Sequence, residues 1–160
     1  MFLILDRWGV GLHTVKFMEK CIKGTELMGV YYFVVAAAIA ALGISLLFKM
    51  NVDKVKADPE QIGIAQRNFF IGVMGIEAMP IILLILGIVT AEPVQSVEEL
   101  YLPAILIVMF LAFAIFFILL QRSVGVSDDS KAAVNTFSVI ALALASSIPI
   151  IALVFLFILM

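Results

Sequence analysis

The sequence predicts an all-α integral membrane protein: two tandem transmembrane helical hairpins, four spans in all, preceded by an amphipathic helix. Of the 160 residues, 64% are hydrophobic and the mean hydropathy is +1.22, whereas soluble proteins are roughly 45–50% apolar. Four apolar runs of about 20 residues or more are each long enough to cross a hydrocarbon core of about 30 Å as a helix. No strand-like alternation competes with these runs, and isolated strand hairpins cannot span a bilayer.

Residues 1–27 are predicted to form an amphipathic helix in the headgroup plane of the membrane. Apolar residues recur at three- and four-residue spacing, with charged residues mostly on the opposite side. The apolar positions are Leu5, Trp8, Leu12, Val15, Met18 and Ile22. The same pattern fits a helix packed on a partner subunit, so both interpretations stand. A cleavable signal peptide is not expected, because the opening apolar run ends before Asp6.

Four segments are predicted to span the membrane: Gly29–Phe48, Phe69–Ala91, Tyr101–Leu120 and Phe137–Met160. They divide the chain into a first hairpin (28–92), a connection (93–100) and a second hairpin (101–160).

Charge predicts the orientation of these spans. Both hairpin loops carry lysine and arginine, whereas the connection between the second and third spans carries Glu92, Glu98 and Glu99 and no basic residue. The positive-inside rule therefore places both hairpin loops in the cytoplasm and this connection outside. Four spans would then put both termini outside, and the basic residues of the N-terminal segment oppose that placement.

Several kinds of function are not expected from the composition. The formal net charge is −2, which gives no basic surface for nucleic acid. Cys21 is the one cysteine and His13 the one histidine, so an internal disulfide and a Cys-based zinc cluster are excluded. Both are interpreted as ordinary residues of the interfacial segment. No cofactor and no bound metal are expected.

The predicted span Phe69–Ala91 contains Glu77, the one acidic or basic side chain within the four spans. A carboxylate at membrane depth costs several kcal/mol, so such residues usually mark an ion or proton path. Desolvation disfavours the charged form, and Glu77 is therefore expected to be protonated at rest. Pro80 lacks an N–H, which leaves the carbonyl of Ile76 free to receive the carboxyl proton. The alternative is a proline that only sets the bend of the helix.

The chain contains an internal repeat with an offset of 69 residues. The run Glu77–Ile82 falls on Ser146–Ile151, so that Pro149 matches Pro80 and Ser146 stands in place of the acid. The loop residues at 58–60 fall on those at 127–129. This agreement favours duplication of one two-helix unit. The alternative is that two apolar helices each contain Pro-Ile-Ile by chance.

The loop KADPE at positions 56–60, followed by Glu77 within FIGVMGIEAMPII at positions 70–82, resembles the hairpin loop and second helix of the proteolipid (ring, c/K-type) subunit of rotary ATPases. The four-span length with a single acid resembles the duplicated vacuolar and archaeal form. The resemblance is specific over residues 55–90. Members usually carry a Gly-x-Gly-x-Gly run on the inner helices, where this chain has alanines.

The resemblance implies a homo- or hetero-oligomeric ring in membrane lipid, turning against a stator subunit whose membrane arginine draws the proton from Glu77. It implies H⁺ rather than Na⁺ as the transported ion, because Ala78 stands where sodium-type members have a hydroxyl. It also implies that the first hairpin loop docks central-stalk subunits, through Lys56, Asp58, Pro59 and Glu60.

Two other classes remain open. One is a non-transporting packing or assembly subunit of a membrane complex, and the other is a small proton-coupled transporter acting alone. The chain is not expected to be catalytic by itself, because one acid at membrane depth lacks a second group for acid–base chemistry or metal binding.

Overall fold

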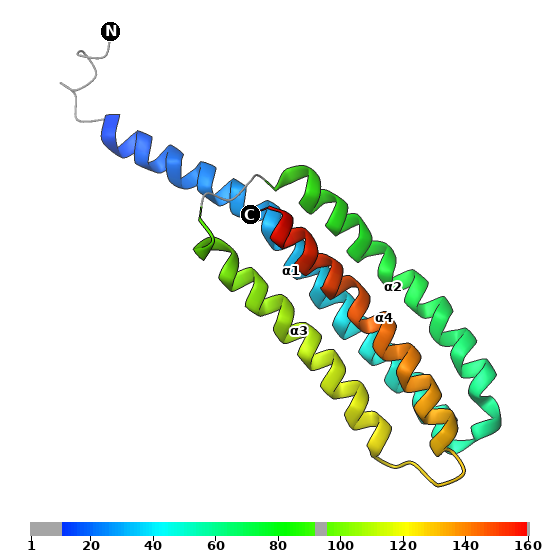
Figure 1. The fold of residues 1–160 in the computed structure, drawn as a ribbon. Helices are drawn as coiled ribbons and strands as arrows, with labels where there is room; N and C mark the ends of the chain where they lie inside the picture. Colours follow the sequence, from blue (N-terminus) through cyan, green and yellow to red (C-terminus); the bar gives the residue numbers. More distant parts are fainter. Residues whose placement is uncertain (1–10, 92–95, 160) are drawn as a thin grey trace.

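The computed structural model describes residues 11–91 and 96–159, with side chains described from residue 28 onward. It contains four α-helices: α1 (Gly11–Ala57), α2 (Ile62–Thr90), α3 (Glu98–Ser123) and α4 (Lys131–Ile158). A short 3-10 helix, η2 (Pro59–Gln61), joins α1 to α2 (Figure 1). These residues contain no β-strand.

Four helices of the described chain are long and apolar enough to cross a membrane. The candidate spans are Met28–Ala57, Pro59–Thr90, Glu98–Ser123 and Lys131–Ile158. The all-helical class and the four apolar spans predicted from the sequence are thereby confirmed, and they are consistent with a multi-pass membrane protein. The helices extend beyond most of the predicted bounds, because helix continues through the polar residues next to each loop.

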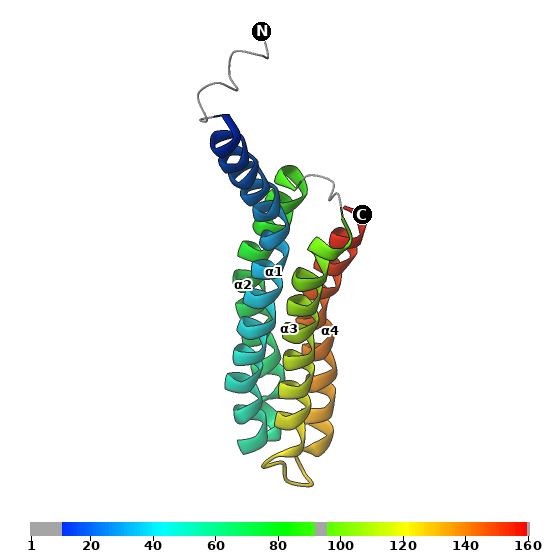
Figure 2. The same cartoon turned by 90° about the vertical axis from the view of Figure 1, so that its left-hand side faces the viewer.

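The helices form an elongated bundle in which successive helices run in opposite directions (Figures 1 and 2). α1 packs against α2, α3 and α4, and α3 also packs against α4. In Figure 1, α1 and α4 lie between α2 and α3. α1 is therefore the helix around which the other three are arranged.

Small side chains explain the central position of α1. Ala36, Ala37, Ala40 and Ala41 are completely buried. Within a bilayer, helix association depends on close van der Waals packing, which small residues permit. Aromatic rings fill the space beyond the alanines: the centroids of Phe48 of α1 and Phe137 of α4 lie 5.2 Å apart.

Glycines set the distance between α1 and α2. A side chain at Gly43 of α1 would bring its Cβ to 2.8 Å from Cγ2 of Ile76. A Cβ at Gly87 of α2 would lie 2.8 Å from two ring carbons of Phe33. Both distances are too short for carbon atoms, so these two positions accept only glycine at the present spacing. The two contacts lie at different levels and fix the antiparallel register of the pair.

The first turns of α1 extend past the ends of the other helices, at the end of the bundle where the chain also terminates (Figure 2). Helix is continuous from Gly11 into the first span. The amphipathic pattern predicted for residues 1–27, with Cys21 and His13, concerns residues or side chains outside those that the structure describes. It stays a prediction.

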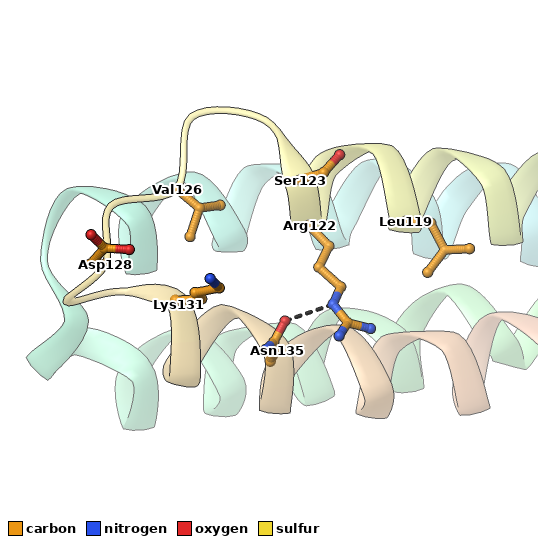
Figure 3. Close-up of a pocket in the computed structure, with 7 residues that line it drawn as sticks. All are labelled: Leu119, Arg122, Ser123, Val126, Asp128, Lys131 and Asn135. Atoms are coloured by element: carbon orange, nitrogen blue, oxygen red, sulfur yellow. Dashed lines mark hydrogen bonds between the residues drawn. The ribbon is translucent and has the colours of Figure 1, made fainter.

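The link between α3 and α4 is held by local polar contacts. Gly125 has a φ of +66°, a conformation in which side chains are disfavoured. Ser130 donates its backbone N–H to the hydroxyl oxygen of Ser127 at 3.3 Å. Nε of Arg122 donates to Oδ1 of Asn135 at 2.6 Å and joins the end of α3 to the start of α4 (Figure 3).

We expect Gly87→Ala to lower the free energy of unfolding in detergent micelles by about 1–3 kcal/mol through overpacking. The ring of Phe33 is fully buried and stacks on Phe155 at 6.2 Å, so it has little room to retreat. Gly75→Ala is the matched control, because no atom lies within 4 Å of the added Cβ. It should be neutral or stabilise α2 by up to about 1 kcal/mol. Equal effects of the two substitutions would contradict this account of the α1–α2 contact.

Candidate functional site

Glu77 lies near the middle of α2, which runs from Ile62 to Thr90. At a rise of 1.5 Å per residue, the carboxylic acid is roughly 20 Å from each end of the helix. The chain length on either side is therefore enough to place Glu77 deep within the hydrocarbon of a bilayer about 30 Å thick. At that depth a charged carboxylate would lose its solvation by water, which is costly.

Glu77 lies at the border between the packed face and the outer face of α2. One turn away on one side are Val73 and Pro80, both buried against the bundle. One turn away on the other side are Met74 and Ile81, which are 75% and 46% exposed. The side chain of Glu77 is itself partly exposed. A molecule that approaches the outer face of α2 can therefore reach the carboxyl group.

The Ser147 hydroxyl of α4 lies close to the Glu77 carboxyl group. The Ser147 hydroxyl also donates to the carbonyl of Leu144 at 2.7 Å. A hydroxyl has one proton to donate and two lone pairs to accept. While its proton is engaged with Leu144, the Ser147 hydroxyl has only lone pairs to offer a neighbouring group. An ionised Glu77 would require Ser147 to release Leu144 and turn its proton toward the carboxylate.

Among the described residues, no cation lies within ion-pair distance of Glu77. The ion pairs present there join Lys49 and Lys56 to Asp53. In the same part of the chain, no group of three or more His, Cys, Asp or Glu side chains is placed to hold a metal ion. The arrangement around Glu77 therefore suits the binding and release of a proton better than permanent charge pairing.

The residues predicted to support Glu77 take different positions. Ile76 fills the space left by Gly43. Pro80 is buried, and α2 continues through it as helix. Ala78 is exposed. The described structure has no hydrogen bond between Glu77 and the carbonyl of Ile76, and the hydroxyl of Ser147, a potential acceptor, lies close by instead.

The second copy of the repeat supplies this acceptor. α4 begins 69 residues after α2, and Pro149 and Pro80 both lie eighteen residues beyond the first residue of their helices. Ser146, which aligns with Glu77, donates to the carbonyl of Leu142 in its own helix at 2.8 Å. Sequence reasoning singled out Ser146 and missed Ser147. The sequence signal that pointed to Ser147 is its position next to Ser146.

The first hairpin loop has a defined local structure. The carboxylate of Asp58 accepts from the backbone N–H of Glu60 and from the side-chain amide of Gln61, both at 3.1 Å. Pro59 occupies the first turn of η2, and Asp58 is the N-cap of this short helix. Two of the residues predicted to dock a partner, Asp58 and Pro59, thus shape the loop, whereas Glu60 is exposed.

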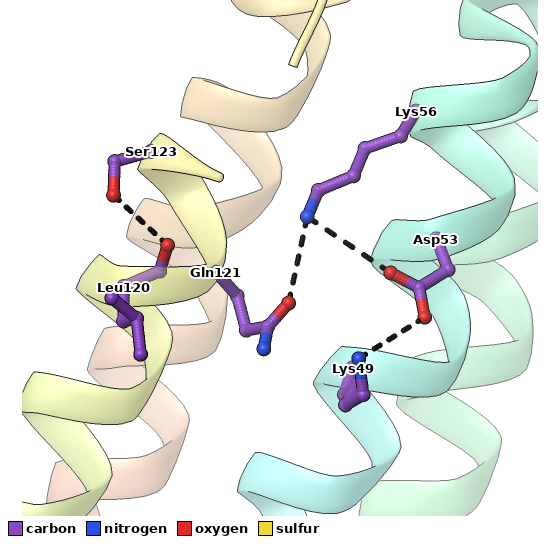
Figure 4. Close-up of polar contacts among 6 residues, drawn as sticks. All are labelled: Lys49, Asp53, Lys56, Leu120, Gln121 and Ser123. Atoms are coloured by element: carbon purple, nitrogen blue, oxygen red, sulfur yellow. Dashed lines mark hydrogen bonds and ion pairs between the residues drawn. The ribbon is translucent and has the colours of Figure 1, made fainter. Parts of the chain in front are cut away.

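Lys56 takes part in a polar network that joins α1 to α3 (Figure 4). Its Nζ lies 3.9 Å from Oδ1 of Asp53 and donates to Oε1 of Gln121 at 3.5 Å. Oδ2 of Asp53 accepts from Lys49 at 3.5 Å. The Lys56 side chain is only 12% exposed. This lysine is therefore engaged within the chain at the loop end of the bundle.

Comparison of the chain with protein-family models, curated proteins and solved structures gives no match.

We expect the Glu77–Ser147 contact to appear as an energetic coupling in a double-mutant cycle. Glu77→Leu and Ser147→Ala should be coupled by about 0.5–1.5 kcal/mol in the free energy of unfolding, because the two side chains lie close together across the contact of α2 with α4. Ser146→Ala is the matched control, since Ser146 bonds to its own helix. Its coupling to Glu77→Leu should be near zero. Equal couplings for the two serines would show that Ser147 is not the partner.

Proposed function

We propose that this chain is a ring-forming proteolipid subunit of a proton-translocating rotary ATPase, with Glu77 as the group that binds and releases the transported proton. The observation that carries the proposal is the placement of Glu77. It is a carboxylic acid at the middle of an apolar helix, beside the outer face, with no cation near it among the described residues. Acids at this depth are costly and are usually functional.

The contacts of Glu77 suit a proton carrier. In contact with lipid, the protonated acid would carry no charge, with the Ser147 hydroxyl close by. Beside a stator subunit with a membrane arginine, the O–H bond breaks, the proton leaves to an aqueous path, and the carboxylate pairs with the guanidinium. Protonation from the other side of the membrane then restores the neutral acid. Each transfer through the membrane potential is worth about 2.3 kcal/mol per charge per 100 mV.

The repeat supports the same proposal. The equal spacing of Ile62 and Lys131 from their prolines is what two tandem copies of one hairpin would produce. The second copy contributes Ser146 and Ser147 in place of a second acid. One acid per four spans means fewer protons per turn, which favours pumping driven by ATP hydrolysis over synthesis.

The loop end would face the rest of the complex. Glu60 is exposed on a loop stiffened by Asp58 and Pro59, and this loop would dock central-stalk subunits. Residues 1–27 would form an amphipathic helix in the headgroup plane at the opposite end. The chain would then be a rotor part with no catalytic group of its own.

A second candidate is a packing or assembly subunit that does not transport ions. The observation that favours it is the closeness of Glu77 to Ser147 of α4 within the same chain. In this role, a permanently protonated acid would only hold α2 to α4.

Glu77→Gln should abolish ATP-driven acidification of inverted membrane vesicles while the complex still assembles, because glutamine has the shape of the acid but no exchangeable carboxyl proton. A hydrophobic carbodiimide such as dicyclohexylcarbodiimide should label Glu77. Acidification is measured with a pH-sensitive dye, labelling by mass spectrometry, and assembly by size-exclusion chromatography.

Glu98→Gln is the control, since Glu98 is an exposed carboxylate at the start of α3. It should pump normally, and Glu98 should remain unlabelled. Full acidification by the Glu77→Gln variant would end the proposal. Loss of assembly rather than of pumping would favour the packing subunit.

A further inference from the structure

A second polar site lies at the loop end of the bundle, between the last turn of α3 and the first turn of α4 (Figure 3). It is an open pocket of about 460 Å³. Its polar wall contains Arg122, Asp128, Lys131 and Asn135, and its apolar wall contains Leu119 and Val126. The proposed function gives none of these residues a role.

One of the two cations of the pocket is held in place by a hydrogen bond, and neither is neutralised by an ion pair within the described structure. Nε of Arg122 donates to Asn135 at 2.6 Å, which fixes the guanidinium plane. In the described structure no carboxylate lies within ion-pair distance of Arg122 or Lys131. Asp128 supplies one negative charge against these two positive charges. The pocket therefore keeps a net positive charge and unused N–H donors.

The start of α4 also favours a bound anion. Lys131 is the first residue of α4, and no acidic residue lies in the first turn of that helix. A cation at a helix N-terminus is opposed by the helix dipole. In addition, the N-cap residue, Ser130, makes no side-chain capping bond to the helix. A bound anion would offset both the charge of Lys131 and the positive end of the dipole.

We infer that this pocket binds an anionic phosphate group, supplied by the headgroup of a phospholipid. The depth fits, because the candidate spans of α3 and α4 end at Ser123 and begin at Lys131, so the pocket lies at the level of the headgroups. The apolar wall continues along the outer surface of the bundle. Leu119 is 43% exposed, and Val139, one turn beyond Asn135, is 60% exposed. The phosphate therefore sits beside the cations while the acyl chains lie along α3 and α4.

The guanidinium suits this ligand. Arginine presents its N–H groups in a planar fork that matches phosphate oxygens, and lysine adds a point charge. Since Asn135 engages only Nε of Arg122, the terminal nitrogens stay available to the ligand. The inference does not depend on the proposed function, because the pocket shares no residue with the Glu77 site.

The test measures lipid binding to the full chain in neutral-detergent micelles by native mass spectrometry, with dioleoyl phosphatidylglycerol as the probe. Arg122→Gln and Lys131→Gln should each weaken binding about fivefold, the effect of one cation near a membrane surface. Arg67→Gln is the matched control, because Arg67 is exposed on α2 and does not line the pocket. It should leave the affinity within about twofold of the unsubstituted chain, well inside the expected fivefold effect.

Further arms of the experiment identify the source of the anion. Dioleoyl phosphatidylcholine should bind more weakly than the glycerol lipid, because choline balances the charge of its phosphate. If inorganic phosphate binds as tightly as the lipid and with the same dependence on Arg122, the ligand is free phosphate and not a lipid headgroup. Displacement of the lipid by an oligoglutamate peptide at similar concentration would point to an acidic protein segment and overturn the inference.

Lys131→Gln also separates loss of the cation from misfolding as the cause of weaker lipid binding. Lys131 makes no side-chain hydrogen bond to the described residues, so its replacement should leave the fold unchanged, as circular dichroism would verify. If phosphatidylglycerol binds equally to the unsubstituted chain and to the Lys131→Gln and Arg122→Gln variants, the pocket is not a phosphate site.

Discussion

Close approach between α1 and its neighbours is the constraint on which the rest of this bundle depends. Inside a bilayer, lipid tails are as apolar as the side chains, so helices associate through tight packing. The buried alanines of α1 and the contacts at Gly43 and Gly87 provide that packing. They also fix how α2 is rotated about its axis. With Val73 and Pro80 turned toward the bundle, Glu77 is placed at the edge of the interface, where packing alone leaves it partly exposed.

That position has a chemical consequence. A fully buried acid would need a permanent partner, and a fully exposed one would have no polar contact in lipid. At the edge, Glu77 meets one hydroxyl, Ser147, which is already committed to its own helix through Leu144. The packing of α1 with α2 thus leaves the acid partly exposed at the outer face, beside one hydroxyl of α4 and without a charged partner among the described residues.

The sequence was sufficient for the four apolar helices, because span length and apolar composition are local properties of the chain. The role given to Glu77 stays a prediction. The sequence did not identify Ser147. The repeat aligned Ser146 with the acid, but one residue along a helix turns a side chain by about 100°, and only the packing of α2 with α4 decides which serine faces Glu77. The carboxylate of Asp58 was predicted to dock a partner, and it caps η2. Distinguishing such roles requires the positions of backbone N–H groups, which composition and motif do not supply.

The polar contacts of the described residues differ with their position along the helices. At the loop end, charged side chains join helices: Lys56 reaches Gln121, and Arg122 reaches Asn135. Deeper in the spans, hydroxyls such as that of Ser138 bond mainly to carbonyls of their own helix. Charged side chains therefore join the helices only near the loop end, where water and headgroups can solvate them. Because those contacts lie far along the helices from Glu77, a change in the charge of this acid would leave them intact.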